Sequence, residues 1–534
     1  MTIINRTRRW AALCAALLFL DVSLTFTNVW PTPAIHWRGE LSIELAVCLL
    51  ALACATRWFR PPSRAMLGWL SAVWIVLVIG RYAEVTAPAL YGRDVNLYWD
   101  LRLMPDVVAM VTRVAPWWLI LLIVTTVVSF FWLLYRGLRW ALHLVTDAMA
   151  HATERRALAG VAALTMALFV GERASARGTV ERVTPAPVTY TYARQAQLVT
   201  AALSGSTSLA ESPSMDSDFA GVKGADVFLI FIESYGAVSY ERPEFAARLA
   251  ASRARLDAAI RATDRDVVSA YVESPTFGGG SWLAHLSLLS GIEVRDPDTN
   301  ALLMTQNRDT LARSFSRRGF RTVALMPGLR QSWPEGTFYG FDEIYGADRL
   351  AYRGPEFGWF AIPDQFSLDR LDALEVGRPS RPPLFVFFPT ISTHFPFSPT
   401  PPYQPDWRRI ATARPYDGPD IVRAYAGEPN WKDFGPGYVE AMAYDFATIE
   451  GYLRKRPDRD FVMILLGDHQ PPAAVSGEAA PWDVPVHVIA RRKHVLDGLL
   501  AHGFREGLTP IRPSLGRMHA LLPILLDVFG DRSN

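Results

Sequence analysis

The sequence predicts two parts of different character: a membrane part of about five helices, and an α/β domain built on a mainly parallel central sheet. Two observations support this. The first third of the chain is strongly apolar and poor in acids, whereas the rest mixes short apolar runs with amphipathic stretches. A chain of 534 residues is long enough for two or more domains. We therefore expect a transmembrane domain over residues 1–171, a linker over residues 172–222 and a folded domain over residues 223–534.

Five apolar segments in the first third are candidates for crossing a bilayer, which takes roughly 20 apolar residues in a helix. They cover residues 10–29, 41–55, 66–79, 117–135 and 157–170. The fourth segment, WWLILLIVTTVVSFFWLLY, carries no charge and gives the clearest signal. The second and fifth are short, and the alternative for each is a buried or interfacial helix. The first has a basic start but no clean cleavage site, so we interpret it as a retained helix and not as a signal peptide.

The distribution of arginines predicts the orientation of these helices, because short cytoplasmic loops carry an excess of Lys and Arg. Arginines cluster before the first segment, after the second, and between the fourth and fifth. The alternate loops mix acids with bases. An odd number of helices then places the folded domain on the outer side of the cytoplasmic membrane, in the periplasm or the extracellular space.

Charge and cysteine content exclude some classes of function. The formal net charge is +2, which gives no electrostatic reason to expect nucleic-acid binding. The three cysteines, Cys14, Cys48 and Cys54, all lie in the apolar third. The folded domain therefore has neither disulfides nor thiolate ligands, which is compatible with an oxidising compartment.

Five apolar runs rich in β-formers follow the Ser-, Ala- and Pro-rich linker: ADVFLIFIES, RTVALMPG, PPLFVFFPT, DFVMILLGD and VPVHVIA. Amphipathic stretches separate them, among them FAARLAASRARLDAAI, DTLARSFSRRGF and YVEAMAYDFATIEGYLRK. Fully apolar strands that alternate with helices predict a parallel sheet covered on both faces. Ligands of such sheets lie beyond the carboxyl ends of the strands.

Acids and imidazoles follow three of these runs. Glu233 follows the first, Thr393-His394 the third, and Gly467-Asp468-His469 the fourth. Carboxylate and imidazole are ligands suited to Zn²⁺ or Mn²⁺. Each residue alone has an ordinary explanation, such as a helix-terminal acid, a hydrogen-bonded structural histidine or a turn. Their shared position at strand ends favours a common site.

A fourth candidate is Ser281, which follows three glycines and begins the amphipathic stretch SWLAHLSLLSG. Glycines allow close backbone approach and unusual dihedral angles. A serine at a helix start also lies near free N–H groups that favour an anion. From the residues alone, Ser281 is equally well explained as a nucleophile or as a helix N-cap.

Four motifs in this order resemble the alkaline phosphatase/sulfatase superfamily, and in particular its lipoteichoic-acid-synthase-like, or phosphoglycerol transferase-like, membrane proteins. The motifs are FIESYG, GGGSWLAHLSLLSG, STHFPF and LLGDHQPP, spread over about 240 residues. The order of membrane helices, linker and outer domain is also similar to that branch.

The resemblance implies a single divalent metal ion, Mn²⁺ or Zn²⁺, and assigns a role to each candidate. Glu233, Asp468 and His469 would be metal ligands, and Ser281 would be both a ligand and the covalent nucleophile. His394 would bind the substrate phosphate or assist the leaving group. Trp333 is similar to a tryptophan that lines the headgroup pocket.

The chain departs from the family's pattern at three places. Serine stands where the branch usually has threonine, which makes Thr276 a rival nucleophile. Leu283 and His285 occupy the positions that must be Pro and Arg for formylglycine formation, so sulfate-ester hydrolysis loses its main support. Glu335 replaces an arginine of the headgroup pocket, and Arg330 is the candidate to hold the headgroup instead.

The expected function is therefore a metal-dependent transfer of a phosphoryl headgroup through a covalent Ser281 intermediate. The donor would be a phospholipid of the outer leaflet, with phosphatidylglycerol favoured, and the acceptor an extracytoplasmic glycan or glycolipid. The alternatives are a phosphoethanolamine transferase, a phosphodiesterase or phosphatase, and a non-catalytic membrane module. Phosphoethanolamine transferases of this kind usually carry several disulfides in the outer domain, and this chain has no cysteine there. A non-catalytic module would be expected to lose ligand side chains, and all four positions keep them here.

Overall fold

The computed structural model describes residues 3–29, 32–59, 61–91, 116–174, 183–204, 209–330, 333, 336–427 and 429–530, together with isolated positions between 92 and 115. The chain divides into two compact units, Met1–Ser206 and Thr207–Asn534. The division falls inside the segment that the sequence predicts as a linker.

In the first unit, each apolar segment predicted from the sequence lies largely in a helix, although the first, residues 10–29, is helical only as far as Thr25. The helices are α1 (Ile3–Thr25), α2 (Ile43–Trp58), α3 (Arg64–Tyr91), α5 (Trp117–Met149) and α6 (Ala152–Ala174), and a small two-stranded sheet pairs β1 (Thr27–Asn28) with β2 (Ile35–His36). Within the described part of the chain, three helices are long and apolar enough to cross a membrane: Arg64–Leu90, Trp117–Met149 and Ala152–Ala174. The membrane character of this unit is thus supported, and the number of five crossings stays a prediction.

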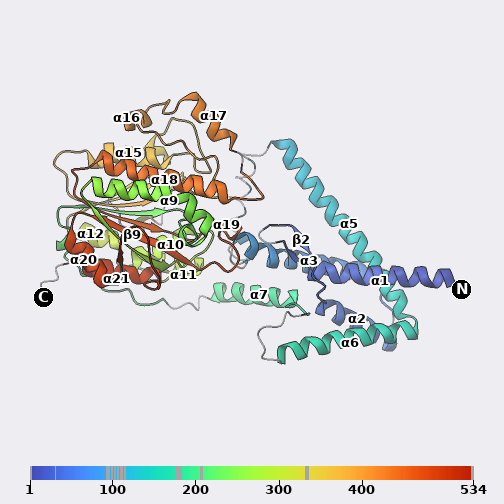
Figure 1. Cartoon of the computed structure of the whole chain (residues 1–534). Helices are drawn as coiled ribbons and strands as arrows, with labels where there is room; N and C mark the ends of the chain where they lie inside the picture. The colour runs from blue at the N-terminus through green and yellow to red at the C-terminus, as the bar shows by residue number, and fades with distance from the viewer. Residues whose placement is uncertain are drawn as a thin grey trace. The chain divides into compact units, whose positions relative to one another are not determined.

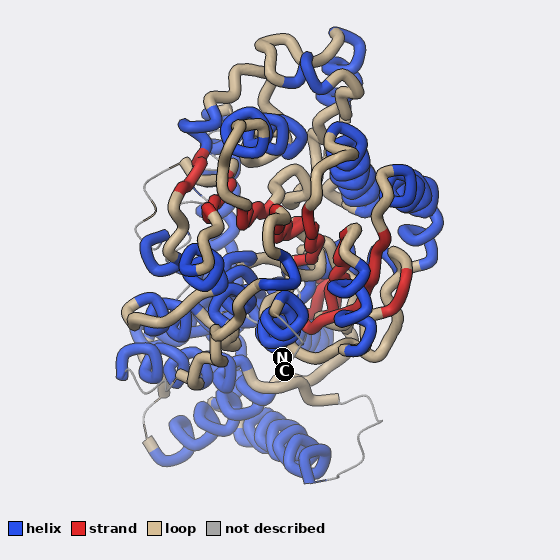
Figure 2. Tube along the Cα trace, turned by 90° about the vertical axis from the view of Figure 1, so that its left-hand side faces the viewer, coloured by secondary structure: helices blue, strands red, loops and turns tan. Residues whose placement is uncertain are grey.

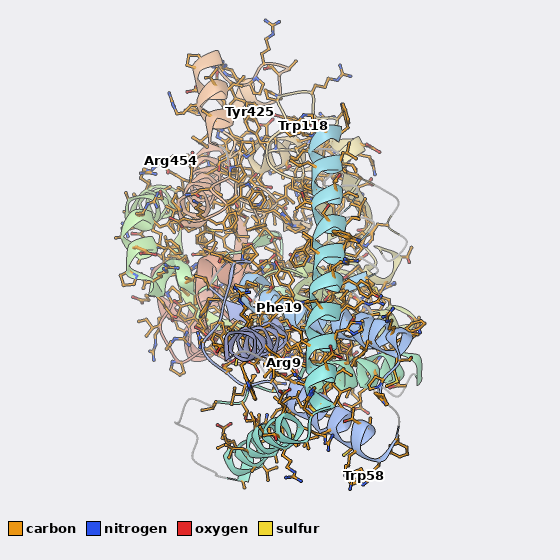
Figure 3. All side chains as sticks on the ribbon, turned by 90° about the vertical axis from the view of Figure 1, so that its right-hand side faces the viewer. Arg9, Phe19, Trp58, Trp118, Tyr425 and Arg454 are labelled. Atoms are coloured by element: carbon orange, nitrogen blue, oxygen red, sulfur yellow. The ribbon has the colours of Figure 1, made fainter. Side chains whose placement is uncertain are left out.

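Helix α5 exposes an unusual amount of apolar surface. The side chains of Trp118, Leu121 and Val128 are each more than half exposed, and Figure 3 shows Trp118 near the start of the helix. Contiguous apolar surface of this extent is unstable in water and is typical of a segment that faces lipid.

The predicted linker contains a helix that the sequence analysis did not anticipate. Helix α7 (Val188–Ser204) lies within residues 172–222, for which the sequence predicts a stem or linker and no particular helix. Two buried side chains hold it in place: Val188, and Gln195, whose amide oxygen accepts from the backbone N–H of Leu97 and whose amide nitrogen donates to the carbonyl of Val95.

In the second unit, one eight-stranded sheet has the order β10-β4-β9-β8-β3-β7-β5-β6. The strands are β3 (Asp226–Ile232), β4 (Asp266–Glu273), β5 (Arg321–Met326), β6 (Glu343–Gly346), β7 (Leu384–Pro389), β8 (Phe461–Gly467), β9 (Asp483–Ala490) and β10 (Arg505–Glu506). All five predicted apolar runs are strands. Neighbours from β8 to β6 pair in parallel, which confirms the mainly parallel sheet.

Strand β9 corrects one expectation, because it runs antiparallel to both β8 and β4. Its fully buried apolar sequence is the same as that of a parallel strand, so composition could not reveal its direction. Strands β4, β6 and β10 were not predicted: β6 and β10 are short, and β4 is bounded by the acids Asp266 and Glu273 and interrupted by Ser269.

Helices cover both faces of this sheet, as Figures 1 and 2 show. Along β3, Val227, Leu229 and Phe231 belong to one apolar core, whereas Phe228, Ile230 and Ile232 belong to the other. The first core is closed by α10 (Ser281–Ser290), α11 (Pro297–Met304), α12 (Leu311–Arg317), α20 (Lys493–Ala501) and α21 (Leu521–Phe529), and the second by α9 (Pro243–Ala262), α15 (Asp364–Leu371) and α18 (Gly435–Lys455).

Short helices fill the connections: η1 (Ala220–Val222), α8 (Val238–Glu241), α13 (Gly336–Tyr339), α14 (Ala347–Leu350), η2 (Asp372–Val376), α16 (Trp407–Ile410), α17 (Gly418–Ala426), α19 (Ala473–Ser476) and η3 (Met518–Ala520). The three amphipathic stretches singled out in the sequence form α9, α12 and α18, as predicted.

Candidate active site

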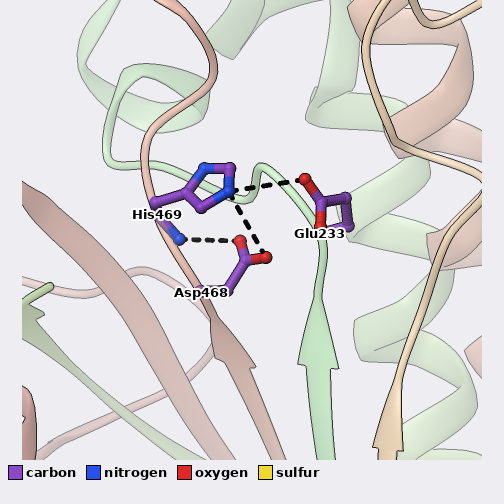
Figure 4. Close-up of side chains that lie close together, drawn as sticks. All are labelled: Glu233, Asp468 and His469. Atoms are coloured by element: carbon purple, nitrogen blue, oxygen red, sulfur yellow. Dashed lines mark hydrogen bonds and ion pairs between the residues drawn. The ribbon is translucent and has the colours of Figure 1, made fainter. Parts of the chain in front are cut away.

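Two adjacent parallel strands, β3 and β8, bring three candidate ligands together at their carboxyl ends. Glu233 follows β3, and Asp468-His469 follows β8, in register with each other across the sheet. Ligand atoms of these three residues all lie within 4.8 Å of one another. Figure 4 shows the two carboxylates and the imidazole facing the same point. The convergence expected from the sequence is confirmed for these residues.

Backbone contacts fix the direction of the Asp468 carboxylate. Oδ1 accepts hydrogen bonds from the backbone N–H of Ser234 at 2.8 Å and of His469 at 2.7 Å. Oδ2 is thereby left to face the cluster, 3.6 Å from Nε2 of His469. Asp468 is fully buried, so this free oxygen needs a positively charged or hydrogen-bonding partner inside the site.

A backbone carbonyl orients the imidazole of His469. Its Nδ1 lies 2.8 Å from the carbonyl oxygen of Gln470, to which a protonated Nδ1 donates. Nε2 then points into the cluster, 3.4 Å from Oε1 of Glu233. A histidine held through one nitrogen by a carbonyl, with the other nitrogen free, has the arrangement typical of a metal ligand.

The hydroxyl group of Ser281 lies in the same cluster. It donates a hydrogen bond to Oε2 of Glu233 at 2.8 Å and lies 3.2 Å from Nε2 of His469. The other carboxylate oxygen of Glu233 accepts from the hydroxyl of Ser234 at 3.1 Å. The structure therefore places a potential nucleophile directly against two of the three candidate ligands.

The three glycines explain how Ser281 reaches this position. Gly278, Gly279 and Gly280 all have positive φ angles, of 67°, 149° and 77°. Such a run of left-handed backbone is accessible to glycine and strained for other residues. It turns the chain sharply so that α10 begins with its first side chain directed at the ends of β3 and β8.

The interpretation of Ser281 as a helix cap is wrong. The N-cap of α10 is Gly280, and no side chain caps this end of the helix. The rival nucleophile Thr276 is also accounted for, because its hydroxyl donates to the carbonyl of Gly279 at 2.5 Å. Thr276 braces the glycine loop, while Ser281 faces the cluster.

The electrostatics of the cluster fit a divalent cation. Burial, reinforced by the charge of Glu233, raises the pKa of Asp468 to about 7. Burial acts to lower the pKa of His469, but the charges of Asp468 and Glu233 outweigh it and raise that pKa. Without a cation the cluster thus retains protons that an ion of charge +2 would displace. Two carboxylates, one imidazole and one hydroxyl form a donor set suited to Zn²⁺ or Mn²⁺.

His394 follows β7, the strand on the other side of β3. Its Nδ1 lies 2.7 Å from the carbonyl oxygen of Phe395, which leaves Nε2 as the free nitrogen. Burial lowers the pKa of His394, and His469 contributes in the same direction, so the resting imidazole is neutral. The ring of Phe360 packs edge-on against the imidazole at 5.0 Å between centroids.

The two predicted headgroup residues have different surroundings. Arg330 lines a cavity of about 390 Å³ together with Asp348, Tyr352, Glu356 and Phe360. Phe360 lines this cavity and also contacts His394. Trp333 packs on Tyr339 at 5.2 Å between ring centroids and belongs to the edge of the apolar core. The roles of Arg330 and Trp333 in substrate binding stay predictions, and Glu335 lies outside the described residues.

Two contacts of this site, Ser234 and Thr390, were not predicted from the sequence. The hydroxyl of Thr390 accepts a hydrogen bond from the backbone N–H of Glu233 at 3.1 Å. Thr390 directly follows β7, so the rule that strand ends carry functional groups would have selected it if hydroxyl groups had been considered beside acids and imidazoles.

Comparisons with known proteins give matches among solved structures alone. No protein-family model matches the chain, and a search of curated proteins gives no match. The chain is similar to the lipooligosaccharide phosphoethanolamine transferase EptA of Neisseria meningitidis, with 14% identity over 90% of this chain and 88% of that one, at a TM-score of 0.43.

Two other solved structures are similar over a smaller part of the chain. The lipoteichoic acid synthase LtaP of Listeria monocytogenes matches with 13% identity over 61% of this chain and 76% of that one, at a TM-score of 0.40. The phosphoglycerol transferase GacH of Streptococcus pyogenes, solved with sn-glycerol-1-phosphate, matches with 11% identity over 64% of this chain and 81% of that one, at a TM-score of 0.37.

Proposed function

We propose that this protein is a membrane-anchored, metal-dependent transferase that moves a phosphoryl headgroup through a covalent intermediate on Ser281. The observation that carries the proposal is the position of the Ser281 hydroxyl, 2.8 Å from Glu233 and 3.2 Å from His469, at the N-terminus of α10. A hydroxyl in the midst of potential metal ligands is the arrangement expected of an activated nucleophile.

Glu233, Asp468, His469 and Ser281 would hold the divalent ion. When bound, the ion supplies positive charge that lowers the pKa of the serine hydroxyl and offsets charge on the phosphoryl oxygens. The free backbone N–H groups at the start of α10 add a favourable electrostatic environment for the same oxygens.

The reaction consists of two half-reactions, in which Ser281 first accepts the phosphoryl headgroup and then transfers it. In the first, an Oγ–P bond forms, the bond from phosphorus to the lipid oxygen breaks, and the serine proton is transferred to the departing alcohol. In the second, the acceptor hydroxyl attacks phosphorus, the Oγ–P bond breaks, and the acceptor's proton returns to Ser281. The free Nε2 of the neutral His394 is suited to relay this proton in both halves.

The membrane unit supports a lipid as the donor. Three described helices are apolar enough to cross a bilayer, so the folded domain is tethered at a lipid surface. A phospholipid of the outer leaflet, with phosphatidylglycerol favoured, would supply the headgroup, and diacylglycerol would remain in the membrane. The acceptor would be a glycan or glycolipid outside the cytoplasmic membrane, which places the catalytic domain in the periplasm or the extracellular space.

The test is to incubate the full chain in detergent with phosphatidylglycerol or phosphatidylethanolamine and to measure diacylglycerol release. We expect release from phosphatidylglycerol that stops on chelation and returns with Mn²⁺ or Zn²⁺. Release from phosphatidylethanolamine alone would identify a phosphoethanolamine transferase. Release of free phosphoglycerol at the full rate without any acceptor would indicate a phosphodiesterase, and no release from either lipid would contradict the proposal.

A further inference from the structure

A second pair of carboxyl groups lies behind the candidate metal site. Asp364 begins α15 and Asp445 lies in the middle of α18, two helices on the same face of the sheet. Their residues are 0% and 1% exposed. Burial of two acids side by side is costly unless hydrogen bonds and a shared proton offset it, so this pair requires an explanation.

Asp364 holds the backbone of the loop that follows β7. Its carboxylate accepts hydrogen bonds from the backbone N–H of Ile391 at 3.0 Å and of Ser392 at 2.7 Å. In return, the hydroxyl of Ser392 accepts from the backbone N–H of Asp364 at 3.2 Å. This loop leads directly into His394, so Asp364 fixes the start of the segment that carries the imidazole.

Asp445 holds the hydroxyl groups of the same loop. Its Oδ2 accepts from Thr390 at 3.1 Å and, more weakly, from Thr393 at 3.5 Å. The hydroxyl of Thr390 has a single proton, and because it gives this proton to Asp445, its lone pair is free to accept the backbone N–H of Glu233 at 3.1 Å. A continuous chain of hydrogen bonds therefore joins Asp445 to a candidate metal ligand.

The second carboxylate oxygen of Asp445, Oδ1, indicates where the pair binds a proton. This oxygen is buried and has no N–H or O–H donor among the described residues. A proton on Oδ1, shared with the carboxylate of Asp364, removes this deficit. The pKa values agree: burial, with repulsion from Asp364 second, raises the pKa of Asp445 well above its usual value, whereas burial raises that of Asp364 only to about 6.

We propose that Asp364 and Asp445 form a one-proton pair, with the proton on Asp445, and that this pair positions Glu233 through Thr390 and positions His394 through the loop of residues 390–393. Both are positioning residues, since neither is placed to touch substrate. The inference rests on the proposed function, because that function gives Glu233 and His394 their roles.

The test compares full-length variants in detergent by their affinity for Zn²⁺ and by kcat and KM. Asp445→Ala and Thr390→Val break the chain of hydrogen bonds, and loss of such an outer contact raises the metal dissociation constant by about 10- to 100-fold. Asp445→Asn restores it, because an amide nitrogen donates to Asp364 and the amide oxygen accepts from Thr390. Asp364→Asn should be more harmful than Asp445→Asn, since two backbone N–H groups lose a charged acceptor.

Thr448→Val is the matched control for Thr390→Val. Thr448 lies on α18 close to Asp445 in sequence, is buried, and its hydroxyl has no hydrogen-bond partner among the described residues. Its variant should bind metal as the wild type does.

The expected pattern is a weakened metal affinity and a reduced kcat in Asp445→Ala and Thr390→Val, with rescue in Asp445→Asn. Wild-type affinity in Asp445→Ala and Thr390→Val would overturn the inference. The inference would also be overturned if Asp445→Ala and Asp445→Asn lowered the metal affinity equally, or if Asp364→Asn lowered it less than Asp445→Asn does. Absence of metal binding by the wild type would instead contradict the proposed function.

Discussion

The hydroxyl of Ser281 donates to Oε2 of Glu233 across 2.8 Å, joining residues 48 positions apart in the sequence. The contact links the first residue of α10 to the end of β3. It places a hydroxyl that is otherwise unreactive at neutral pH in contact with a group that would hold a metal ion.

Replacing Ser281 by alanine should abolish turnover. Because the hydroxyl is the proposed nucleophile, we expect a loss on the order of 10³-fold or more in kcat, with the protein still folded. The control is Thr276→Val, which loosens the glycine loop but leaves the nucleophile, so it should slow the reaction without preventing it. Full activity in Ser281→Ala, measured as diacylglycerol release, would refute the mechanism.

Asp468→Asn should reduce metal content and activity together. The variant removes one charge from the cluster that would hold the ion, and elemental analysis of purified protein measures the outcome. Asp460→Asn is a matched control, since Asp460 precedes the same strand, at the opposite end from Asp468, and pairs with Arg492 at 2.7 Å. A wild-type metal content in Asp468→Asn, or activity that survives exhaustive chelation, would contradict the metal site.

The free energy of unfolding of the folded domain should decrease in acid because His487 is buried as the neutral imidazole. Its Nδ1 lies 2.6 Å from the hydroxyl of Ser269, which itself donates to the carbonyl of Gly507, and its Nε2 lies 2.9 Å from the hydroxyl of Tyr235. These contacts suit the neutral ring. Burial, with a contribution from Arg253, lowers its pKa from 6.5 to about 3.

The direction of the effect follows from proton binding. Between pH 6.5 and about 3 the unfolded chain binds the proton that the folded ring rejects, so stability falls as pH falls. The slope contributed by one such group is about 1.4 kcal/mol per pH unit. Thermal unfolding of the full chain over this range should show a shallower pH dependence in His487→Gln than in the wild type. Identical pH dependences would show that His487 is protonated in the folded state.

Arg330→Ala should raise KM for the donor lipid and leave kcat nearly unchanged. Arg330 lines the cavity beside Phe360, which packs on His394, and so lies where a headgroup would bind without lying in the described ligand cluster. Loss of binding energy shared by ground state and transition state appears in KM. A fall in kcat at unchanged KM would place Arg330 in the chemistry instead.

The ligand cluster could be predicted from the sequence because strand ends are local features. Glu233 and Asp468 each follow a fully apolar run, and parallel strands place such residues at one edge of a sheet. The direction of β9 could not be predicted, since a fully buried apolar run is compatible with parallel and with antiparallel pairing. Helix α7 was missed because the Ser- and Pro-rich composition around it concealed a short helical segment.

The position of the Ser281 side chain could not be predicted from the sequence. A serine after three glycines is compatible with a cap or a nucleophile, and the choice depends on where the side chain points, which Gly280 determines by taking the cap position itself. Asp445 was overlooked because it was treated as one polar residue of an amphipathic helix. Its burial depends on the loop after β7, which contacts it from more than 50 positions away in sequence.

The most direct test of the covalent mechanism is mass spectrometry of the peptide containing Ser281 after the full chain is incubated with phosphatidylglycerol and no acceptor. The account predicts a phosphoglycerol increment on Ser281 that disappears when an acceptor is added and is absent from Ser281→Ala. Turnover without any adduct on Ser281, or an adduct on Thr276 instead, would contradict it.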